Sequence, residues 1–418
     1  MQASQEKLQR RRIALPISSY LPNLGGMEVG LHNIASKLIE RNFEPIVIAP
    51  AGHVKQLRQK GWNLPYQVKA FPPKVWSILS RAPALGFFVL DSYFAYMQRR
   101  YRFDFWHCTA GYPTGVSLIH FARKRQDIRY LIRCVGEDIQ KDSTIGYGVR
   151  LKPGIDLLLR NLLPQSEMLI AISNSVREEY LSVGVDESRI QNVPNGVDLN
   201  RFKLGIDSRK IRHRYGLDAG TFLFISVGRN HIKKNYKQLI KATALLSKRI
   251  ETDFRVLIVG RGASKLAEET KHLGVSDLVL LKEEIGSTPS LGCVPQLPSL
   301  ELIELYLAAD AFVFPSLLET FGVAIVEAMA ASLPVIVGDT PGCRDVVRHG
   351  EDGIMVSPHD TNNLADEMRS LVENSGKRLV FSKKSALRAQ DFSWDSVVDD
   401  YIKLYEGTWD KFPQCGSK

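Results

Sequence analysis

Short apolar runs recur along the chain, and helix-like segments separate them. The runs are nearly continuous in Val, Ile, Leu and Phe, a pattern typical of strands in parallel sheets that helices cover on both faces. The rhythm stops near residue 200 and restarts after residue 205. Two such series predict two doubly wound α/β domains. The runs are residues 12–17, 45–50, 103–108, 129–135 and 167–173, then 221–228, 254–260, 278–282, 311–316, 334–339 and 353–358.

The length of 418 residues also exceeds what one ordinary core holds. Between the two series lies "VPNGVDLNRF", residues 193–202, whose Pro-Asn-Gly gives turn chemistry. We therefore predict a first domain over residues 1–200 and a second over residues 201–390. Residues 391–418 have helical periodicity over most of their length and are predicted to cross back to the first domain.

Bulk composition restricts the compartment and the partners. The sequence contains no run of 18 apolar residues, so no membrane-spanning helix is predicted. Residues 1–12 are not followed by the apolar core of a signal peptide. Five scattered cysteines without a Cys-x-x-Cys pair suit a reducing compartment, so we expect a cytoplasmic protein. They are Cys108, Cys134, Cys293, Cys343 and Cys415.

Positive charge is concentrated in the first part of the chain. Residues 1–160 contain 24 Lys and Arg against 11 Asp and Glu, whereas the rest contains 31 against 34. A basic surface favours lipid head groups, phosphorylated carriers or nucleic acid, and the alternative is a solvated face. Residues 74–103 add aromatic side chains and a terminal arginine cluster. They predict either a helix at a membrane surface or a helix pair packed on the core.

Two loops after predicted strands carry phosphate-binding features. Gly25 and Gly26 precede a helix, where backbone N–H groups and the helix dipole attract phosphate; an ordinary tight turn is the alternative. The loop after residues 221–228 contains Arg229, Lys233 and Lys234. Arginine and lysine side chains together commonly bind a diphosphate. The alternative is a basic turn that is only solvated.

The stretch "PSLLETFGVAIVEAMA", residues 315–330, places two carboxylates on either side of a helix start. Backbone N–H groups of residues 320–323 would open that helix and receive a phosphate. Glu319 lies ahead of it and Glu327 about 12 Å further along its axis. Since a carboxylate accepts two hydroxyl hydrogen bonds, the pair suits a ligand made of sugar, diphosphate and ribose. Alternatively, Glu319 caps the helix and Glu327 forms a surface ion pair.

"ETFGVAIVEAMAASLPVI" resembles the Glu-x7-Glu signature of the family-4 retaining glycosyltransferases, which have the GT-B fold of two facing Rossmann-like domains. Further similarity lies in "LPNLGGMEVGLHNIASKLIERNFEPIVIAP", "NVPNGVDLNRF", "SVGRNHIKKNYKQLIKA" and "PGCRDVVRHGEDGIMVSPHD". The resemblance covers most of the chain, with Asn235 replacing the family's usual glycine.

The resemblance implies a role for each matching position. Arg229 and Lys234 would hold the donor diphosphate, work that a metal does in other glycosyltransferases, so no metal and no cofactor is expected. Glu319 would contact the transferred sugar and Glu327 the ribose. The remaining donor contacts would come from Thr320, Phe321, Gly322 and Val323, with Gly25 and Gly26 closing from the first domain.

The first domain departs from the family pattern. The family's His-x-His is reduced to His107 with Thr109, and Val135 precedes Gly136 where a histidine is usual. His107 is a catalytic candidate or a structural residue, and Asp138, beside Glu137, is a candidate for contacting sugar or acceptor.

The leading hypothesis is transfer of a hexose-type sugar from a UDP- or GDP-linked donor to a glycan or lipid-linked hydroxyl acceptor, in cell-envelope polysaccharide or glycolipid synthesis. The basic first domain would associate peripherally with the inner face of an anionic membrane. One alternative is a nucleotide-sugar 2-epimerase of the same fold, which would not be expected to carry Glu-x7-Glu. Another is a nucleic-acid-binding protein with a vestigial sugar site, but the chain shows no recognisable binding module, so we expect no nucleic acid.

Overall fold

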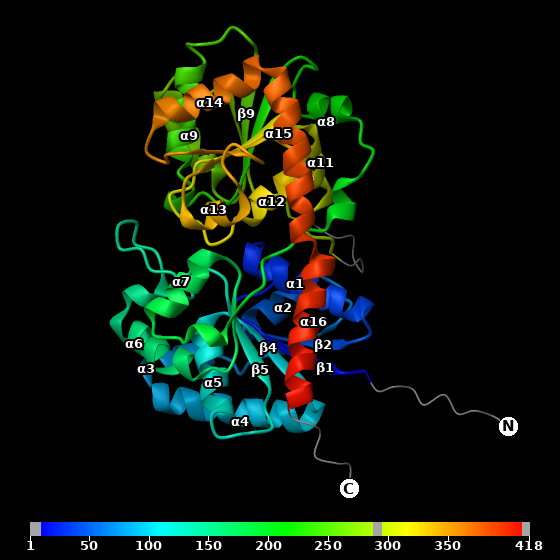
Figure 1. Cartoon of the computed structure of the whole chain (residues 1–418), viewed down its shortest axis with the longest axis vertical. Helices are drawn as coiled ribbons and strands as arrows, with labels where there is room; N and C mark the ends of the chain where they lie inside the picture. Colours follow the sequence, from blue (N-terminus) through cyan, green and yellow to red (C-terminus); the bar gives the residue numbers. More distant parts are fainter. Residues whose placement is uncertain (1–9, 287–294, 412–418) are drawn as a thin grey trace, which may run out of the picture.

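Two parallel sheets, each enclosed by helices, form the two halves of the molecule in a computed structural model that describes residues 10–286 and 295–411 (Figure 1). The first sheet has the strand order β3-β2-β1-β4-β5-β6-β7 and the second β10-β9-β8-β11-β12-β13. Every strand pair is parallel. The predicted fold class is therefore confirmed. Cys293, Cys415, the first nine residues of the predicted first domain and residues 412–418 of the predicted returning segment lie outside the described residues.

The strands coincide with the apolar runs, with two exceptions. β3 and β7 were not predicted, because each is short, partly polar and at an edge of the sheet. The strands of the first sheet are β1 Arg12–Pro16, β2 Glu44–Ala49, β3 Gln67–Ala70, β4 Phe105–Thr109, β5 Tyr130–Cys134, β6 Leu169–Ala171 and β7 Ile190–Asn192. Those of the second are β8 Phe222–Val227, β9 Phe254–Val259, β10 Val279–Lys282, β11 Ala311–Phe314, β12 Val335–Gly338 and β13 Ile354–Val356.

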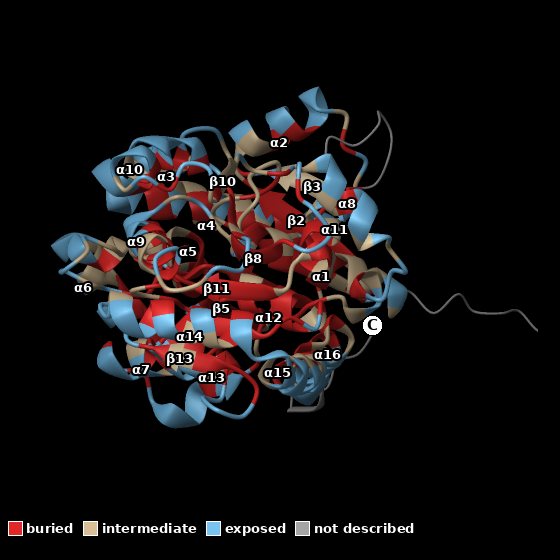
Figure 2. Cartoon of the chain, turned by 90° about the horizontal axis from the view of Figure 1, so that it is seen from above, coloured by how far each residue is buried: buried red, intermediate tan, exposed pale blue. Residues whose placement is uncertain are grey.

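Helices cover both faces of each sheet, and their exposed sides lie at the outside of the molecule while the strands are mostly buried (Figure 2). In the first half they are α1 Gly26–Glu40, α2 Ala51–Gln59, α3 Val75–Arg81, α4 Pro83–Tyr101, α5 Val116–Ala122, α6 Pro153–Leu162 and α7 Asn174–Ser182. The second half has α8 Ser208–Arg214, α9 Tyr236–Leu246, α10 Ala267–His272, α11 Leu300–Ala308, α12 Val323–Ala330, α13 Pro341–Val346, α14 Thr361–Glu373 and α15 Ser375–Arg388. The last helix is α16, Trp394–Lys411.

α16 returns to the first sheet and packs beside α1 (Figure 1). Its apolar face joins a buried cluster with β1, β2, α1 and α2, to which it contributes Trp394, Val397, Val398, Tyr401, Tyr405 and Trp409. Ion pairs link Lys37 to Asp395 and Arg41 to Asp399 at the rim of this contact. The first domain is thus built from two separate pieces of the chain.

Where the chain crosses between the sheets, the two crossing segments bond to each other. The amide of Val197 donates to the carbonyl of Phe392 at 2.7 Å, and the amide of Trp394 donates to the carbonyl of Val197 at 3.1 Å. A Cβ atom at Gly196 would lie 2.6 Å from the Trp394 ring, so glycine permits the contact.

Residues 74–103 form the helix pair α3 and α4. They pack so closely that a Cβ at Gly86 would lie 2.4 Å from Leu79 Cα. Phe87, Leu90 and Phe94 point into the core. The core-packing alternative is therefore confirmed for one face of α4. Among the described residues, no helix has the length and apolar character that crossing a bilayer requires.

Candidate functional site

A cavity of about 630 Å³ lies between the two sheets and is lined from both sides. In parallel sheets, ligand crevices form where the strand order reverses, beyond the carboxyl ends of the strands. The order reverses between β1 and β4 in the first sheet and between β8 and β11 in the second. The loops after β1, β8 and β11 carry the predicted glycines, cations and Glu319 respectively, so the topology brings these residues to one place.

Glu319 lies at the centre of a buried ionic cluster. Its carboxylate accepts a hydrogen bond from the Lys234 ammonium, and Lys233 Nζ lies 3.6 Å from its other oxygen. Burial alone would raise the pKa of Glu319, but the two ammonium groups lower it to about 2. Glu319 is therefore a carboxylate at every physiological pH. Burial lowers the pKa of Lys234, although Glu319 opposes the effect.

The backbone after Glu319 turns at Gly322 so that α12 begins at the cavity. Gly322 precedes the helix with a φ of 86°, a left-handed conformation that favours glycine. No side chain caps α12, so the predicted capping alternative for Glu319 is wrong. Thr320 to Val323 all line the cavity. A Cβ at Gly342 would lie 2.3 Å from the Glu319 carbonyl oxygen, so α13 packs directly against this loop.

Glu327 lines the same cavity from the second turn of α12. It is buried, and it accepts a hydrogen bond of 3.0 Å from the Tyr306 hydroxyl, so the surface-pair alternative is wrong. Burial raises its pKa to about 7, against the lowering effects of that hydrogen bond and of the Arg201 charge. The two glutamates thus differ sharply in acidity because only Glu319 has lysine partners.

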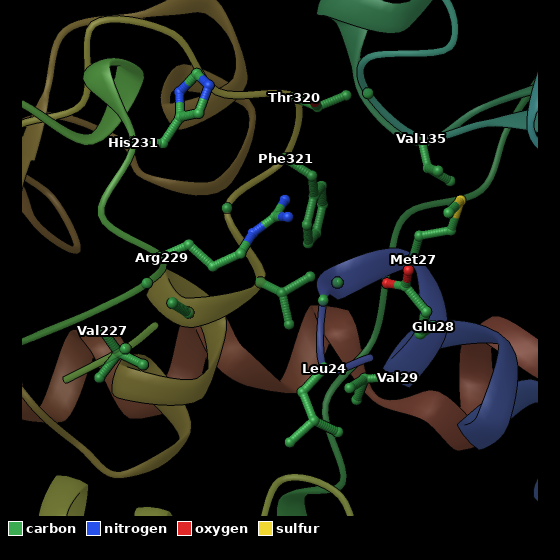
Figure 3. Close-up of a pocket in the computed structure, with 18 of the residues that line it drawn as sticks. Leu24, Met27, Glu28, Val29, Val135, Val227, Arg229, His231, Thr320 and Phe321 are labelled. Atoms are coloured by element: carbon green, nitrogen blue, oxygen red, sulfur yellow. The ribbon is translucent and has the colours of Figure 1, made fainter. Parts of the chain in front are cut away.

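Arg229 extends into the cavity beside Phe321 (Figure 3). It follows β8, and a single 3-10 turn, Ile232–Lys234, then presents both lysines. Asn235 ends that turn at a φ of 57°, and its amide donates to the carbonyls of Pro315 and Pro358. Asparagine tolerates this left-handed position, which explains how it replaces a glycine there.

The first domain presents a second helix N-terminus to the cavity. Gly25 precedes α1 and Gly26 is its first residue. A Cβ at Gly26 would lie 3.5 Å from the side chain of Val323, so the starts of α1 and α12 approach each other across the cleft. Two helix N-termini that converge make a favourable environment for anionic groups.

His107 does not reach the cavity, and its candidacy as a catalytic residue is wrong. It is fully buried, its Nδ1 shares a hydrogen bond of 2.6 Å with the Tyr405 hydroxyl, and its ring packs on Tyr401. Burial lowers its pKa, so the ring is neutral. Helix α16 covers the side chain, and no motif or periodicity in the sequence indicates that contact.

Asp138 lines the cavity, but backbone groups occupy its oxygens. It accepts hydrogen bonds from the amides of Gly111, Val135 and Gly136 at 2.7, 3.1 and 2.8 Å. Its place supports a positioning role for the loop after β5 rather than direct catalysis. Glu137, the neighbouring candidate, is exposed and also lines the cavity.

Two residues of that first-domain loop bind the Glu319 cluster directly and were not predicted. Gln140 donates to the Glu319 carbonyl at 3.3 Å and accepts from the Thr320 hydroxyl at 2.8 Å. Lys233 donates to the Tyr147 hydroxyl at 3.4 Å and lies over its ring. Neither residue stands in a recognisable motif, so only the three-dimensional contact reveals them.

Two glycosyltransferase family models match the two halves of the chain. The profile described as "Glycosyltransferase Family 4" matches residues 24–201, and "Glycosyl transferases group 1" matches residues 207–388. A curated relative, "D-inositol 3-phosphate glycosyltransferase" of Rhodococcus jostii, is 29% identical over 293 residues, or 70% of this chain. The match spans 61% of that relative's length.

Solved structures share the fold over nearly the whole chain. A glycosyltransferase from Rickettsia africae superposes with a TM-score of 0.75 at 17% identity, covering 95% of this chain and 98% of that one. HepE from Anabaena, solved in complex with UDP and glucose, superposes with a TM-score of 0.71 at 20% identity. The superposition covers 94% of this chain and 99% of HepE.

Proposed function

Because the chain belongs to glycosyltransferase family 4, we propose that it transfers a hexose-type sugar from a nucleoside diphosphate sugar to a hydroxyl acceptor with retention of anomeric configuration. One observation carries the proposal. The buried Glu319–Lys233–Lys234 cluster lies beside Arg229, where two helix N-termini converge from opposite domains. Such a site has positive charge for a diphosphate and a carboxylate for sugar hydroxyls.

The chemical step follows from where these charges lie. The acceptor hydroxyl oxygen bonds to the anomeric carbon while the bond from that carbon to the β-phosphate oxygen breaks, and the bonding pair leaves with the phosphate. The acceptor proton passes to the departing phosphate oxygen. Lys234 and Arg229 stabilise the charge that develops on the leaving group, the role that oriented positive groups fill in transition-state stabilisation. The proposed step requires neither a metal nor a protein nucleophile.

The two glutamates bind opposite ends of the donor. Glu319 accepts hydrogen bonds from the transferred sugar, and Glu327, further along α12, accepts them from the ribose. The backbone of residues 320–323 contacts the diphosphate between them. UDP or GDP is the nucleotide we expect.

Nucleotide binding is expected to release a proton near pH 7, because Glu327 must be ionised to accept both ribose hydroxyls while its pKa in the free protein is about 7. The nucleotide affinity should therefore fall by up to about tenfold per pH unit below 7 and level off above it. Isothermal titration in buffers of different ionisation enthalpy measures the proton. In Glu327→Gln the protein should release no proton on binding, so that any remaining proton release comes from the nucleotide itself. An equal proton release in wild type and variant contradicts the assignment.

Thermal unfolding with UDP, GDP, ADP and CMP tests the function, on the wild type and on Arg229→Ala. A nucleotide at about 100 times its Kd should stabilise the protein by 2.7 kcal/mol, an easily measured shift. One nucleotide should stabilise the wild type, and Arg229→Ala should lose the response. If no nucleotide shifts the unfolding curve over a wide concentration range, the donor site is wrongly assigned.

The exposed face of α4 supports peripheral attachment to an anionic membrane, with envelope glycan or glycolipid synthesis at its inner face. Leu85, Phe88 and Tyr96 are exposed on this helix, and Arg99 and Arg100 are exposed at its end. α4 lies at the end of the first domain that is remote from the second (Figure 1). The wild type should co-sediment with anionic vesicles, and Phe88→Asp should weaken the binding. No co-sedimentation of the wild type would refute the attachment, and equal co-sedimentation of the variant would show that α4 does not mediate it.

A further inference from the structure

Within the described part of the chain, the basic residues that line the cavity all belong to the second domain: Arg229, His231, Lys233, Lys234 and Arg261. The second domain also contributes the acids Glu284, Glu319 and Glu327 to the lining. The first domain supplies three acids, Glu28, Glu137 and Asp138, together with serines, tyrosines and apolar side chains. This arrangement runs against the bulk composition, since the excess of Lys and Arg lies in residues 1–160. The described basic residues of the first domain therefore lie outside the cavity lining.

Two buried arginines of the first domain show where positive charge goes instead. Arg150 pairs with Asp156 at 2.7 Å and with Glu179 at 2.5 Å. Arg133 is fully buried and donates to Asn195. Neither lines the cavity. An anion that entered from the first-domain side would therefore meet no compensating cation from that domain among the described residues.

The three acids differ in what already binds them. The Asp138 carboxylate accepts hydrogen bonds from three backbone amides, and Glu28 accepts a hydrogen bond of 2.6 Å from the Ser19 hydroxyl. Glu137 is exposed; its backbone carbonyl accepts from the Val149 amide at 2.9 Å, but its carboxylate has no hydrogen bond or ion pair among the described residues. It interacts electrostatically with Tyr147 on its own side and with His231 across the cleft. Its carboxylate is thus the group best placed to accept from an incoming hydroxyl and to repel a phosphate.

On the basis of the proposed function, we infer that the acceptor's reacting end is an uncharged polyol or sugar ring, with no phosphate beside the attacking hydroxyl. Inositol 3-phosphate, the acceptor in the names of the curated relatives, does not fit such a lining. Arg229, Lys233 and Lys234 serve the donor diphosphate and Glu319, and Arg261 pairs with Glu284 at 2.9 Å, so none of these cations is free for an acceptor phosphate. A lipid diphosphate has to lie at least one sugar ring away from the attacking hydroxyl.

Titration of nucleotide-saturated protein with inositol 3-phosphate tests this inference. The wild type should give no binding at millimolar concentration. Glu137→Lys, which replaces the free carboxylate by a cation, should bind at least tenfold more tightly. Glu178→Lys makes the same change of charge at an exposed position of α7 outside the cavity, and it should behave like the wild type.

The possible results distinguish a failure of the proposed donor site from a failure of the acceptor inference. Nucleotide stabilisation is measured first on each variant, and its absence refutes the donor site, not the acceptor inference. With nucleotide bound, binding of inositol 3-phosphate to the wild type overturns the inference, as does a Glu137→Lys variant that gains none. Release of nucleoside diphosphate from the donor gives a second readout. If inositol 3-phosphate accelerates that release more than myo-inositol does, the acceptor is not uncharged.

Discussion

The variant Lys234→Ala should lose about 10²- to 10³-fold in kcat, the usual cost of removing one preorganised charge at a developing anion. Lys234 donates to Glu319 and also lies 4.3 Å from the Phe314 ring centre, so its ammonium is fixed before substrate binds. Removing it also leaves Glu319 with only the more distant Lys233. The pKa of Glu319 should then rise from about 2. Initial rates of nucleoside diphosphate release measure the loss.

The free energy of unfolding should also fall in the same variant, since removing one partner of a buried ion pair costs about 3–5 kcal/mol. The loss should lie near the lower end of this range because Lys233 remains as a cation beside Glu319. Lys237→Ala is the matched control. Lys237 lies one turn further along, is largely exposed, and pairs with Glu269 outside the cavity. It should keep full activity and nearly full stability. A Lys234→Ala enzyme that retains wild-type kcat would show that Lys234 serves only to hold Glu319 in the fold.

The second large effect is expected from Gly342→Ala, a change that touches no substrate. The new methyl group would lie 2.3 Å from the Glu319 carbonyl oxygen and 2.7 Å from the Thr320 carbonyl carbon, both of them backbone atoms. The loop must therefore move, and a displacement near 1 Å costs about 10²-fold in rate. Overpacking should also destabilise the protein by about 1–3 kcal/mol. Steady-state kinetics and thermal unfolding measure both effects.

Gly52→Ala controls for the loss of a glycine as such. Gly52 lies in α2, where a Cβ meets nothing within 4 Å, so alanine should be neutral or stabilise the helix by up to about 1 kcal/mol. If Gly342→Ala is as active as Gly52→Ala, then α13 does not fix the position of the Glu319 loop.

Strand prediction succeeded where burial on both faces makes the sequence continuously apolar. β8 and β11 are of this kind, with nearly every residue buried. It failed for β3, in which no residue is buried, because an edge strand needs only half of its surface to be apolar. Local pattern therefore reports the centre of a parallel sheet better than its edges.

The candidate site divides in the same way. The second-domain residues follow β8 and β11, which are neighbours in the sheet, and they lie in motifs, so the sequence was enough to predict that Arg229, Lys234, Glu319 and Glu327 share one site. The first-domain residues depend on contacts between distant segments. His107 is covered by Tyr405, almost 300 positions later, and Gln140 meets Thr320 across the cleft. No periodicity or motif in one sequence encodes such pairings.

The return of α16 to the first domain has a consequence for how the protein is made. A ribosome releases the chain in order, and domains generally fold as they emerge. Here the cluster formed by β1, β2, α1 and α2 lacks Trp394, Tyr401, Tyr405 and their neighbours until α16 is synthesised, after the whole of the second domain. The second domain, continuous in sequence, can complete its core earlier. Synthesis therefore finishes the second domain before the first, and a chain interrupted before α16 leaves its oldest part with an open apolar face.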